Sequence, residues 1–277
     1  MRNIHIGLQL YGVRETLAAD FEGTLRAVAG MGYEYVEFAG ECYGGRTGEE
    51  IKNLLDSLGL KCLSVHRNLS AFDHDPDGEI GFLKTFGVKY VVIPWYDKEN
   101  LVGEAGKESF RKFTDFGRRL AAHGMKLAYH NHDFEFEKDG DRYIHDRIFE
   151  NVPAELIDPE LDTCWVAYAG LDPAAKIRQF AGRVEIVHLK DFVCKKLAGG
   201  PAYELVGKEN EKISKEDNGF EFRPVGMGRQ DFAAILRACD ECGTELAIVE
   251  QDRTYGGMTE LEAAKLSRDY LKNTFGL

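Results

Sequence analysis

The sequence of 277 residues has no excess of positive charge and no long apolar run. Its formal net charge is -12, and no run of Lys and Arg builds a basic stretch, so nonspecific attraction to nucleic acid is disfavoured. No segment approaches the roughly 20 apolar residues of a membrane-spanning helix. The stretch Met1–Gly7 lacks the apolar region of a signal peptide. We therefore expect a cytoplasmic protein that binds neither nucleic acid nor a membrane.

Cysteine is also sparse, with six residues scattered along the chain. Cys239 and Cys242 have the CxxC spacing of some zinc and redox sites, but they lie in a helix-like segment and no second pair accompanies them. Reduced thiols are expected, as is usual for a cytoplasmic chain. No linker or low-complexity tract interrupts the chain, which predicts a single domain over residues 1–277.

The chain does contain a recurring joint between helix-like and strand-like sequence. A glycine follows the helix-like pattern, one or two polar residues come next, and then a β-branched and apolar run begins. Glycine takes the left-handed conformation that ends many helices, so each copy marks a helix-to-strand connection. The joints centre on Gly32, Gly59, Gly87, Gly124, Gly182 and Gly243, and Pro153 replaces glycine in a seventh. The first joints are about 30 residues apart, which is typical of one βα unit.

These joints, together with the opening segment, predict eight strands. The predicted strands are Ile4–Leu10, Tyr35–Phe38, Lys61–His66, Tyr90–Pro94, Lys126–Asn131, Glu155–Asp162, Val184–Lys190 and Glu245–Glu250. Amphipathic helices are predicted over Leu17–Met31, Glu49–Leu58, Phe110–His123 and Glu260–Phe275. Eight strands alternating with helices over about 250 residues indicate an α/β fold, a single (β/α)8 TIM barrel. A doubly wound open sheet is the competitor, but its glycine-rich fingerprint after the first strand is absent.

One connection is too long for a plain βα unit. The segment from about Phe192 to Arg223, after the seventh strand, is rich in Lys, Glu and Gly. Loops of this length are uncommon without a function. We interpret residues 192–223 as an insertion over the carboxyl end of the barrel, either a lid or an oligomer contact, which leaves a homo-oligomer open.

The predicted ends of strands five to eight all carry His or carboxylate residues. The fifth strand leads into His130, His132 and Glu135, and the last three end at Asp162, His188 and Glu250. A TIM barrel places its active site at the carboxyl ends of its strands. Mixed nitrogen and oxygen ligands suit one divalent ion. The sequence therefore predicts a site for Mn²⁺, Zn²⁺, Co²⁺ or Mg²⁺.

Simpler explanations exist for each residue taken alone. A strand-end carboxylate such as Asp162 often caps a helix, and His188 can be a hydrogen-bonded core residue. Trp95, Trp165 and Phe134 can wall a sugar pocket or can fill the barrel. The joint pattern favours the metal site. A phosphate loop at Gly103–Ser109 is disfavoured, because Glu108 follows Lys107 where a hydroxyl is required.

Motifs spread over nearly the whole chain are similar to those of a known family. They are Gln9-Leu10-Tyr11, Tyr35-Val36-Glu37, Tyr129–Phe136, Leu161-Asp162-Thr163, His188-Leu189-Lys190-Asp191 and Val249-Glu250. In order and spacing they resemble the sugar phosphate isomerase/epimerase family, the xylose isomerase-like TIM barrels. The resemblance is specific for the superfamily and weak for the substrate.

The resemblance implies one divalent ion held by Glu, Asp, His and Glu from strands five to eight. Asp162, His188 and Glu250 match the last three ligands, whereas His130 stands where many members have glutamate. Either His130 ligates the ion, or Glu135 reaches it from the loop. Ketose 3-epimerases of the family use paired glutamates as acid and base, and one of that pair is missing here. The Tyr-His-Asn-His variant is similar to members that act as lyases or dehydratases on keto-sugars and inososes.

The predicted function is a metal-dependent sugar isomerase or epimerase that abstracts a proton next to a carbonyl through an enediolate. The alternatives are a metal-dependent lyase or dehydratase on keto-sugars, inososes or 3-keto-glycosides, and a non-catalytic sugar-binding barrel. Glu250 or His132 would be the base, and Lys190 would steady the oxyanion. The predicted substrate contacts are Gln9, Tyr11, Glu37, His66 and Trp95. The candidates for holding a phosphate are Arg14, Arg67 and Arg229.

A related barrel, the DNA-repair endonuclease, is the other enzymatic class to weigh. It requires a His-rich cluster of several zinc ions and a basic surface that faces DNA. Eight histidines and a net charge of -12 argue against it.

Overall fold

The computed structural model describes residues 4–197 and 214–277. Its parallel strands form a closed barrel in the order β1-β12-β9-β8-β5-β4-β3-β2. The barrel strands are β1 (His5–Gln9), β2 (Tyr35–Ala39), β3 (Ser64–His66), β4 (Tyr90–Ile93), β5 (Lys126–His130), β8 (Ile157–Asp162), β9 (Ile186–Leu189) and β12 (Leu246–Val249). The predicted (β/α)8 TIM barrel is confirmed, and the open sheet is excluded because β1 pairs with both β2 and β12.

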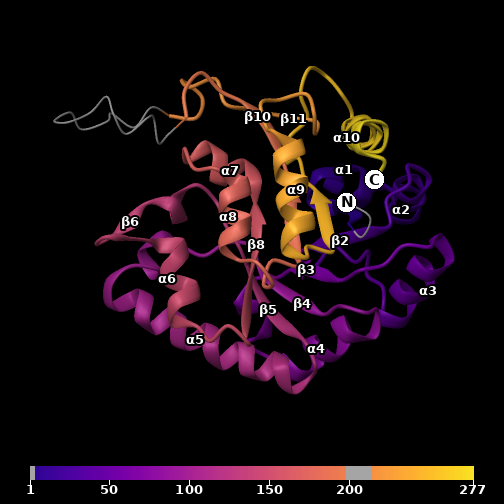
Figure 1. Ribbon diagram of the computed structural model, residues 1–277. Helices are drawn as coiled ribbons and strands as arrows, with labels where there is room; N and C mark the ends of the chain where they lie inside the picture. The colour runs from indigo at the N-terminus through magenta and orange to yellow at the C-terminus, as the bar shows by residue number, and fades with distance from the viewer. Residues whose placement is uncertain (1–3, 198–213) are drawn as a thin grey trace.

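Helices surround the barrel and separate successive strands along the chain (Figure 1). The α-helices are α1 (Arg14–Ala19), α2 (Phe21–Gly30), α3 (Gly48–Leu58), α4 (Pro76–Thr85), α5 (Gly103–Ala122), α6 (Ile144–Asn151), α7 (Thr163–Tyr168), α8 (Pro173–Gln179), α9 (Phe232–Cys242) and α10 (Glu260–Phe275). Short 3-10 helices, η1 (Leu10–Val13), η2 (Leu69–Phe72), η3 (Lys98–Asn100) and η4 (Phe134–Phe136), lie in loops. A small ribbon, β6 (Lys138–Asp139) with β7 (Arg142–Tyr143), precedes α6.

Two predicted helices and one predicted strand have different bounds in the structure. The predicted helix Leu17–Met31 is two helices, α1 and α2, because the Asp20 side chain accepts a hydrogen bond from Gly23 N at 2.9 Å and starts a new helix. The predicted helix Phe110–His123 begins earlier, at Gly103, in α5. The segment Gly103–Ser109, which was disfavoured above as a phosphate loop, forms the first turns of this helix. The predicted third strand, Lys61–His66, is shortened to Ser64–His66, with Lys61 making only an isolated bridge to Tyr35.

The hydrophobic core has two layers, because successive strand residues point to opposite faces of the sheet. The outer layer lies between the strands and the helices. The inner layer fills the barrel with Tyr90, Val92, Ala128, Ile186, Leu246 and Ile248. The next interior positions toward the carboxyl ends include His130, His188 and Glu250, so the filling changes from apolar to ionisable at the barrel mouth.

The ends of the predicted insertion form a ribbon at one end of the barrel (Figure 1). In this ribbon β10 (Asp191–Val193) pairs antiparallel with β11 (Glu221–Arg223). The turn after β11 is held by Asp191 Oδ2, which accepts hydrogen bonds from Gly226 N at 3.0 Å and Gly228 N at 2.8 Å. Residues 198–213 of the insertion lie outside the described residues. Its role as a lid or oligomer contact, and the single-domain organisation, stay predictions.

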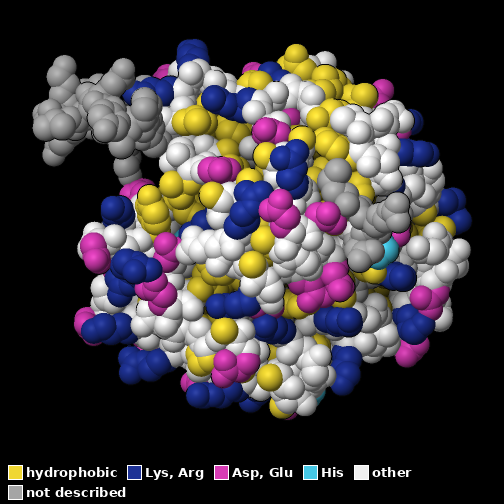
Figure 2. Space-filling model, viewed as in Figure 1, with side chains coloured by type: hydrophobic (Ala, Val, Ile, Leu, Met, Phe, Trp, Pro, Cys, Tyr) yellow, Lys and Arg dark blue, Asp and Glu magenta, His cyan; other side chains and the backbone are white. Residues whose placement is uncertain are grey.

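The surface carries both signs of charge. On the face shown in Figure 2, Lys and Arg side chains are interspersed with Asp and Glu, and no single sign covers a large area. Within residues 4–197 and 214–277, no helix is long and apolar enough to cross a membrane. Ionisable groups are buried together at the barrel mouth.

Candidate metal centre and adjoining cavity

Four neighbouring strands bring one donor side chain each to the carboxyl mouth of the barrel. They are β5, β8, β9 and β12, and the residues are His130, Asp162, His188 and Glu250. Each occupies an interior position at or next to the end of its strand, so ring closure turns all four toward one point. One ligand atom from each lies within 4.8 Å of the others, and all four residues are buried.

Asp162 divides its two carboxylate oxygens between a helix and this cluster. Oδ1 accepts hydrogen bonds from Cys164 N at 2.8 Å and Trp165 N at 3.3 Å, and so caps α7. Oδ2 accepts no hydrogen bond from any described residue and lies 3.3 Å from Lys190 Nζ and 3.6 Å from His130 Nε2. The helix-cap role weighed above is therefore present, and it leaves the second oxygen free to face the cluster.

A second carboxylate layer lies directly beneath the first. Glu160 precedes Asp162 by two residues on β8 and therefore points to the same interior face. Its Oε1 lies 2.7 Å from His66 Nε2 and 3.1 Å from both His130 Nδ1 and His188 Nε2. Glu160 was not among the predicted site residues, although its spacing of two residues from Asp162 on one strand indicated the same interior face.

Glu160 contacts one ring nitrogen of His130 and one of His188, so the second nitrogen of each ring faces Asp162 and Glu250. His130 Nε2 lies 4.0 Å from Glu250 Oε2, and His188 Nδ1 lies 3.0 Å from the same oxygen. A carboxylate that holds one ring nitrogen is the usual support behind a histidine ligand to a metal.

Gln9 and Glu37 lie in this deeper layer, below the cavity and not on its wall. Both are completely buried, and Gln9 Nε2 donates a hydrogen bond to Glu37 Oε2 at 2.7 Å. The same carboxylate oxygen lies 2.9 Å from His188 Nε2. The structure therefore does not bring these two predicted substrate contacts to the cavity, because their interior positions lie one layer too deep.

The cluster has more carboxylates than cations. Glu37, Glu160, Asp162 and Glu250 surround Lys190 and three histidines. Burial raises the pKa of Asp162 to about 6, although Lys190 opposes the shift, and burial lowers the pKa of His130 to about 4. For His188, Glu160 and Glu37 outweigh burial and raise the pKa well above its usual value. A divalent cation would offset the surplus negative charge, and the free Asp162 Oδ2 is a ligand atom for it.

Glu135, the other candidate ligand from strand five, is turned away from the cluster. Its two oxygens accept hydrogen bonds from Tyr129 Oη and His132 N, both at 2.8 Å. Tyr129 packs in the outer layer of the core, and η4 folds Glu135 back onto it. Burial raises the pKa of Glu135 to about 8. Of the two residues that the sequence left open as the strand-five ligand, His130 and Glu135, the structure places His130 with the other candidate ligands.

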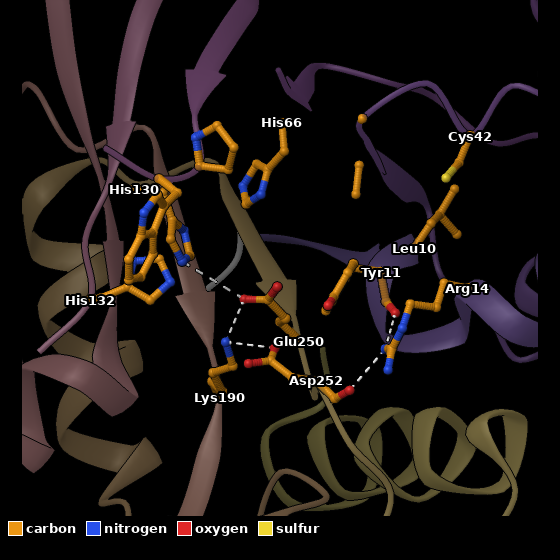
Figure 3. Close-up of a pocket in the computed structure, with 14 residues that line it drawn as sticks. Leu10, Tyr11, Arg14, Cys42, His66, His130, His132, Lys190, Glu250 and Asp252 are labelled. Atoms are coloured by element: carbon orange, nitrogen blue, oxygen red, sulfur yellow. Dashed lines mark hydrogen bonds and ion pairs between the residues drawn. The ribbon is translucent and has the colours of Figure 1, made fainter. Parts of the chain in front are cut away.

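A cavity of about 450 Å³ opens directly above this cluster. It is lined by Leu10, Tyr11, Arg14, Ala39, Gly40, Cys42, His66, Pro94, Trp95, His130, His132, Lys190, Glu250 and Asp252. Figure 3 shows Tyr11 and Arg14 across from His130 and His132, with Glu250 and Lys190 between the two sides. Tyr11, His66 and Trp95 thus line the cavity as predicted, whereas loop residues such as Cys42 were missed because no periodic pattern places them.

His132 follows β5 and reaches the cavity from the loop. Its ring centroid lies 4.7 Å from that of Trp95 and 5.7 Å from that of Trp165. Its Nδ1 has no hydrogen-bond partner within the described part of the chain. Burial and the neighbouring His130 lower the pKa of His132 well below its usual value. The cavity therefore has a neutral imidazole on its wall, outside the set of candidate ligands.

The three arginines considered for phosphate lie in different places. Arg14 borders the cavity, and its guanidinium donates to the backbone oxygens of Tyr11 and Asp252 at 2.8 Å each. Arg67 is buried in ion pairs with Glu79 and Glu41. Arg229 donates to the backbone oxygen of Cys194. Of these three, Arg14 is the one that the structure brings to the cavity.

A closed parallel barrel with candidate nitrogen and oxygen ligands gathered at its carboxyl mouth places this chain among the TIM barrels. Residues 25–274 match the family model described as xylose isomerase-like TIM barrel. The chain belongs to this family, which confirms the resemblance found in the sequence.

Relatives with assigned names share part of the chain. The rhizopine catabolism protein MocC of Rhizobium meliloti is 28% identical over 180 residues, 56% of this chain and 54% of that protein. The inosose dehydratase of Clostridium beijerinckii is 28% identical over 168 residues, which cover 58% of this chain and 51% of that protein. The chain thus aligns with about half the length of these relatives. The inosose dehydratase of Clostridium perfringens (strain 13 / Type A) is 24% identical over 71% of this chain and 68% of its own.

Solved structures extend the likeness of fold to the whole chain. A sugar phosphate isomerase/epimerase from Parabacteroides distasonis has a TM-score of 0.76 at 22% identity, covering 99% of this chain and 95% of that one. The IOLI protein, solved with a zinc atom bound, has a TM-score of 0.70 at 18% identity, covering 99% and 100%. At these identities the likeness shows the fold alone.

Proposed function

We propose that this protein is a divalent-metal-dependent lyase that acts on a cyclic keto-sugar or an inosose. It would remove a proton next to the carbonyl and expel an oxygen substituent from the following carbon. The observation that carries this proposal is the buried group His130, Asp162, His188 and Glu250, of which His130 and Glu250 line a 450 Å³ cavity. Relatives named inosose dehydratase support elimination over isomerisation.

His130, Asp162, His188 and Glu250 would hold the ion, with Glu160 behind both imidazoles. When bound, a divalent ion of the Mn²⁺, Zn²⁺, Co²⁺ or Mg²⁺ type polarises a carbonyl and stabilises the negative charge of an enediolate. The donor set fits such an ion, because two imidazoles and two carboxylates are mixed ligands of intermediate hardness.

His132 and Lys190 are our candidates for the proton chemistry. His132 lines the cavity and takes the α-proton as base. Lys190 Nζ, 2.9 Å from Glu250 Oε2, brings its positive charge to the oxygen on which negative charge develops. Glu250 is the alternative base. An H132N variant that keeps its metal but loses turnover supports His132, whereas full turnover by H132N supports Glu250.

An isomerase or epimerase is the second candidate. Its reaction also begins with removal of the α-proton, and some structural neighbours are named as such enzymes. Epimerisation needs a proton donor on the opposite substrate face, and the strand-five glutamate that some family members use there is replaced by His130. Reaction in D₂O separates the outcomes. An isomerase or epimerase returns a product of unchanged composition with deuterium at carbon, whereas a lyase releases water or an alcohol.

The direct test combines metal analysis with a substrate screen. Purified protein loaded with each of the four metals would be incubated with inososes, ketoses and 3-keto-glycosides, and the products followed by NMR. We expect one metal ion per chain and an unsaturated or dehydrated product. An Asp162→Ala variant should lose both the metal and turnover, and a metal-free variant that stays active would overturn the proposal. Absence of a stoichiometric metal would instead favour a non-catalytic sugar-binding barrel.

A further inference from the structure

A second cavity of about 630 Å³ adjoins the one above the candidate metal centre. It is lined by Tyr11, Arg14, Trp165, Lys215, Glu216, Phe220, Glu221, Phe222, Asp252, Arg253, Thr254, Tyr255 and Gly256. Tyr11, Arg14 and Asp252 also line the first cavity, so the two share a wall. The outer part is built from the end of the insertion and the loop after β12.

Aromatic rings with charged neighbours form this outer cavity. Trp165 and Phe220 stack with centroids 5.4 Å apart, and Phe222 meets Trp165 edge-on at 5.8 Å. Lys215 Nζ lies 4.2 Å from the centroid of the Trp165 ring. Trp165 is only 4% exposed, because Phe220 and Lys215 cover its ring, so the rings open to a ligand are the half-buried Phe220 and Phe222 and the exposed Tyr255. A sugar or aromatic ring packs its face on such rings while its edge forms polar contacts.

Exposed aromatic side chains gather around both cavities. Tyr11 is 43% exposed, Trp95 50% and Tyr255 38%, although large apolar side chains are normally covered. Trp95 lines the inner cavity, Tyr255 the outer one, and Tyr11 both. The exposed rings therefore follow a path from the candidate metal centre into the outer cavity.

Lys190 marks the junction between the two cavities. Its Nζ lies 5.3 Å from the ring centroids of both Trp165 and Phe222, which line the outer cavity. The same ammonium lies 2.9 Å from Glu250 Oε2 and 2.8 Å from Asp252 Oδ1, which line the inner cavity (Figure 3). A substrate that extends from one cavity into the other passes close to this group.

We propose that the outer cavity binds the second ring of a two-ring substrate. The substrate class is a cyclic keto-sugar or keto-cyclitol joined through an oxygen atom to another sugar or an aromatic ring. This inference rests on the proposed function and specifies the leaving group. The base takes the α-proton, a carbon–carbon double bond forms, and the bond from the β-carbon to the bridging oxygen breaks. The oxygen takes that proton back from the conjugate acid of the base, and the second ring leaves as an alcohol. No oxidant or reductant is consumed.

Two glucosides that differ in the second ring test the outer cavity. The probes are 4-nitrophenyl β-D-glucopyranoside and methyl β-D-glucopyranoside, titrated calorimetrically into the full chain loaded with Mn²⁺. We expect the nitrophenyl glucoside to bind about tenfold more tightly, as one well-stacked ring contributes. Tyr255→Ala should remove most of that difference and leave methyl glucoside binding unchanged. Trp95→Ala should weaken both ligands, because Trp95 lines the inner cavity.

Leu266→Ala is the matched control, since Leu266 is 40% exposed on α10 and lines neither cavity. Lys215→Ala is a second probe of the outer wall, because it removes the ammonium beside the Trp165 ring together with its ion pair to Asp133. Equal affinity of the two glucosides, equal weakening of both by Tyr255→Ala, or no binding of either probe would overturn the inference. Metal content measured on the same samples separates the two proposals. One ion per chain with equal glucoside affinities retains the proposed metal site and rejects the outer subsite.

Discussion

Two buried clusters in this protein are made of the same ingredients but differ in what they can do. At the barrel mouth, histidines, carboxylates and Lys190 surround one point. Between α6 and α8, His145, Asp146 and Lys176 form a smaller cluster, in which Lys176 Nζ lies 2.5 Å from Asp146 Oδ1. The centroid of the His145 ring lies 4.9 Å from that of the Phe149 ring and 5.1 Å from that of the Phe136 ring.

The difference lies in charge balance and access. In the α6–α8 cluster one lysine matches one aspartate, aromatic rings enclose the histidine, and none of the three residues lines either cavity. At the mouth the carboxylates outnumber the cations, and His130, Lys190 and Glu250 border open space. Buried ionisable groups alone therefore do not mark a site. What distinguishes the barrel mouth is a surplus of carboxylates next to a cavity that Glu250 and Lys190 line.

The largest expected effect is the loss of metal from the mouth cluster. Asp162→Asn keeps an oxygen that can cap α7 but removes the negative charge. We expect kcat/KM to fall by about 1000-fold or more, as for loss of a charge-stabilising group, and metal analysis to find less than one ion per chain. Unchanged metal content and turnover would show that Asp162 serves only as a helix cap.

The matching change in the α6–α8 cluster should affect stability and leave the metal in place. Asp146→Ala leaves the Lys176 ammonium, which is only 6% exposed, buried without its carboxylate partner and with Gln179 Oε1 as its remaining hydrogen-bond acceptor. The free energy of unfolding should fall by about 3 kcal/mol, measured by urea denaturation, while metal content stays at the wild-type value. Loss of metal from this variant would contradict the separation of the two clusters.

Glu160→Gln tests the layer beneath the candidate ligands. Because Glu160 meets one nitrogen each of His130 and His188, its charge orients both rings. We expect metal affinity to drop about 10- to 100-fold, with a changed visible spectrum of the Co²⁺-loaded protein. A variant that is less stable but has unaltered affinity and spectrum would assign Glu160 a structural role only.

His145 should make stability depend on pH. Burial lowers its pKa to about 4, whereas an unfolded histidine titrates near 6.5. Between these pH values the folded state binds fewer protons than the unfolded state. The stabilisation that comes from the neutral His145 is therefore complete above about pH 6.5 and is lost as pH falls toward 4. His145→Phe removes the titrating ring. The free energy of unfolding of this variant, relative to that of the wild type, should rise by about 1 to 2 kcal/mol when the pH is lowered from 7 to 5, as measured by urea denaturation. A pH-independent difference would contradict this.

Local sequence determined the elements and most of the barrel mouth. Glycine caps and alternating apolar residues depend on neighbours in the chain, so eight strands, α10 and the order of the strand ends could be predicted. Asp162, His188 and Glu250 could be named in the same way, because a βα repeat sends every strand end to one rim. The break at Asp20 was missed, since one side-chain cap decided it.

The tertiary structure decided everything that depends on depth and distance within the ring. Closure of the barrel sets how far each interior residue lies from the mouth, and so it placed Gln9 and Glu37 below the cavity and Glu160 behind two imidazoles. The choice between His130 and Glu135 followed from a loop that folds Glu135 back onto Tyr129. The outer cavity arises where the insertion meets the loop after β12, and such a meeting of distant segments leaves no periodic pattern in the sequence.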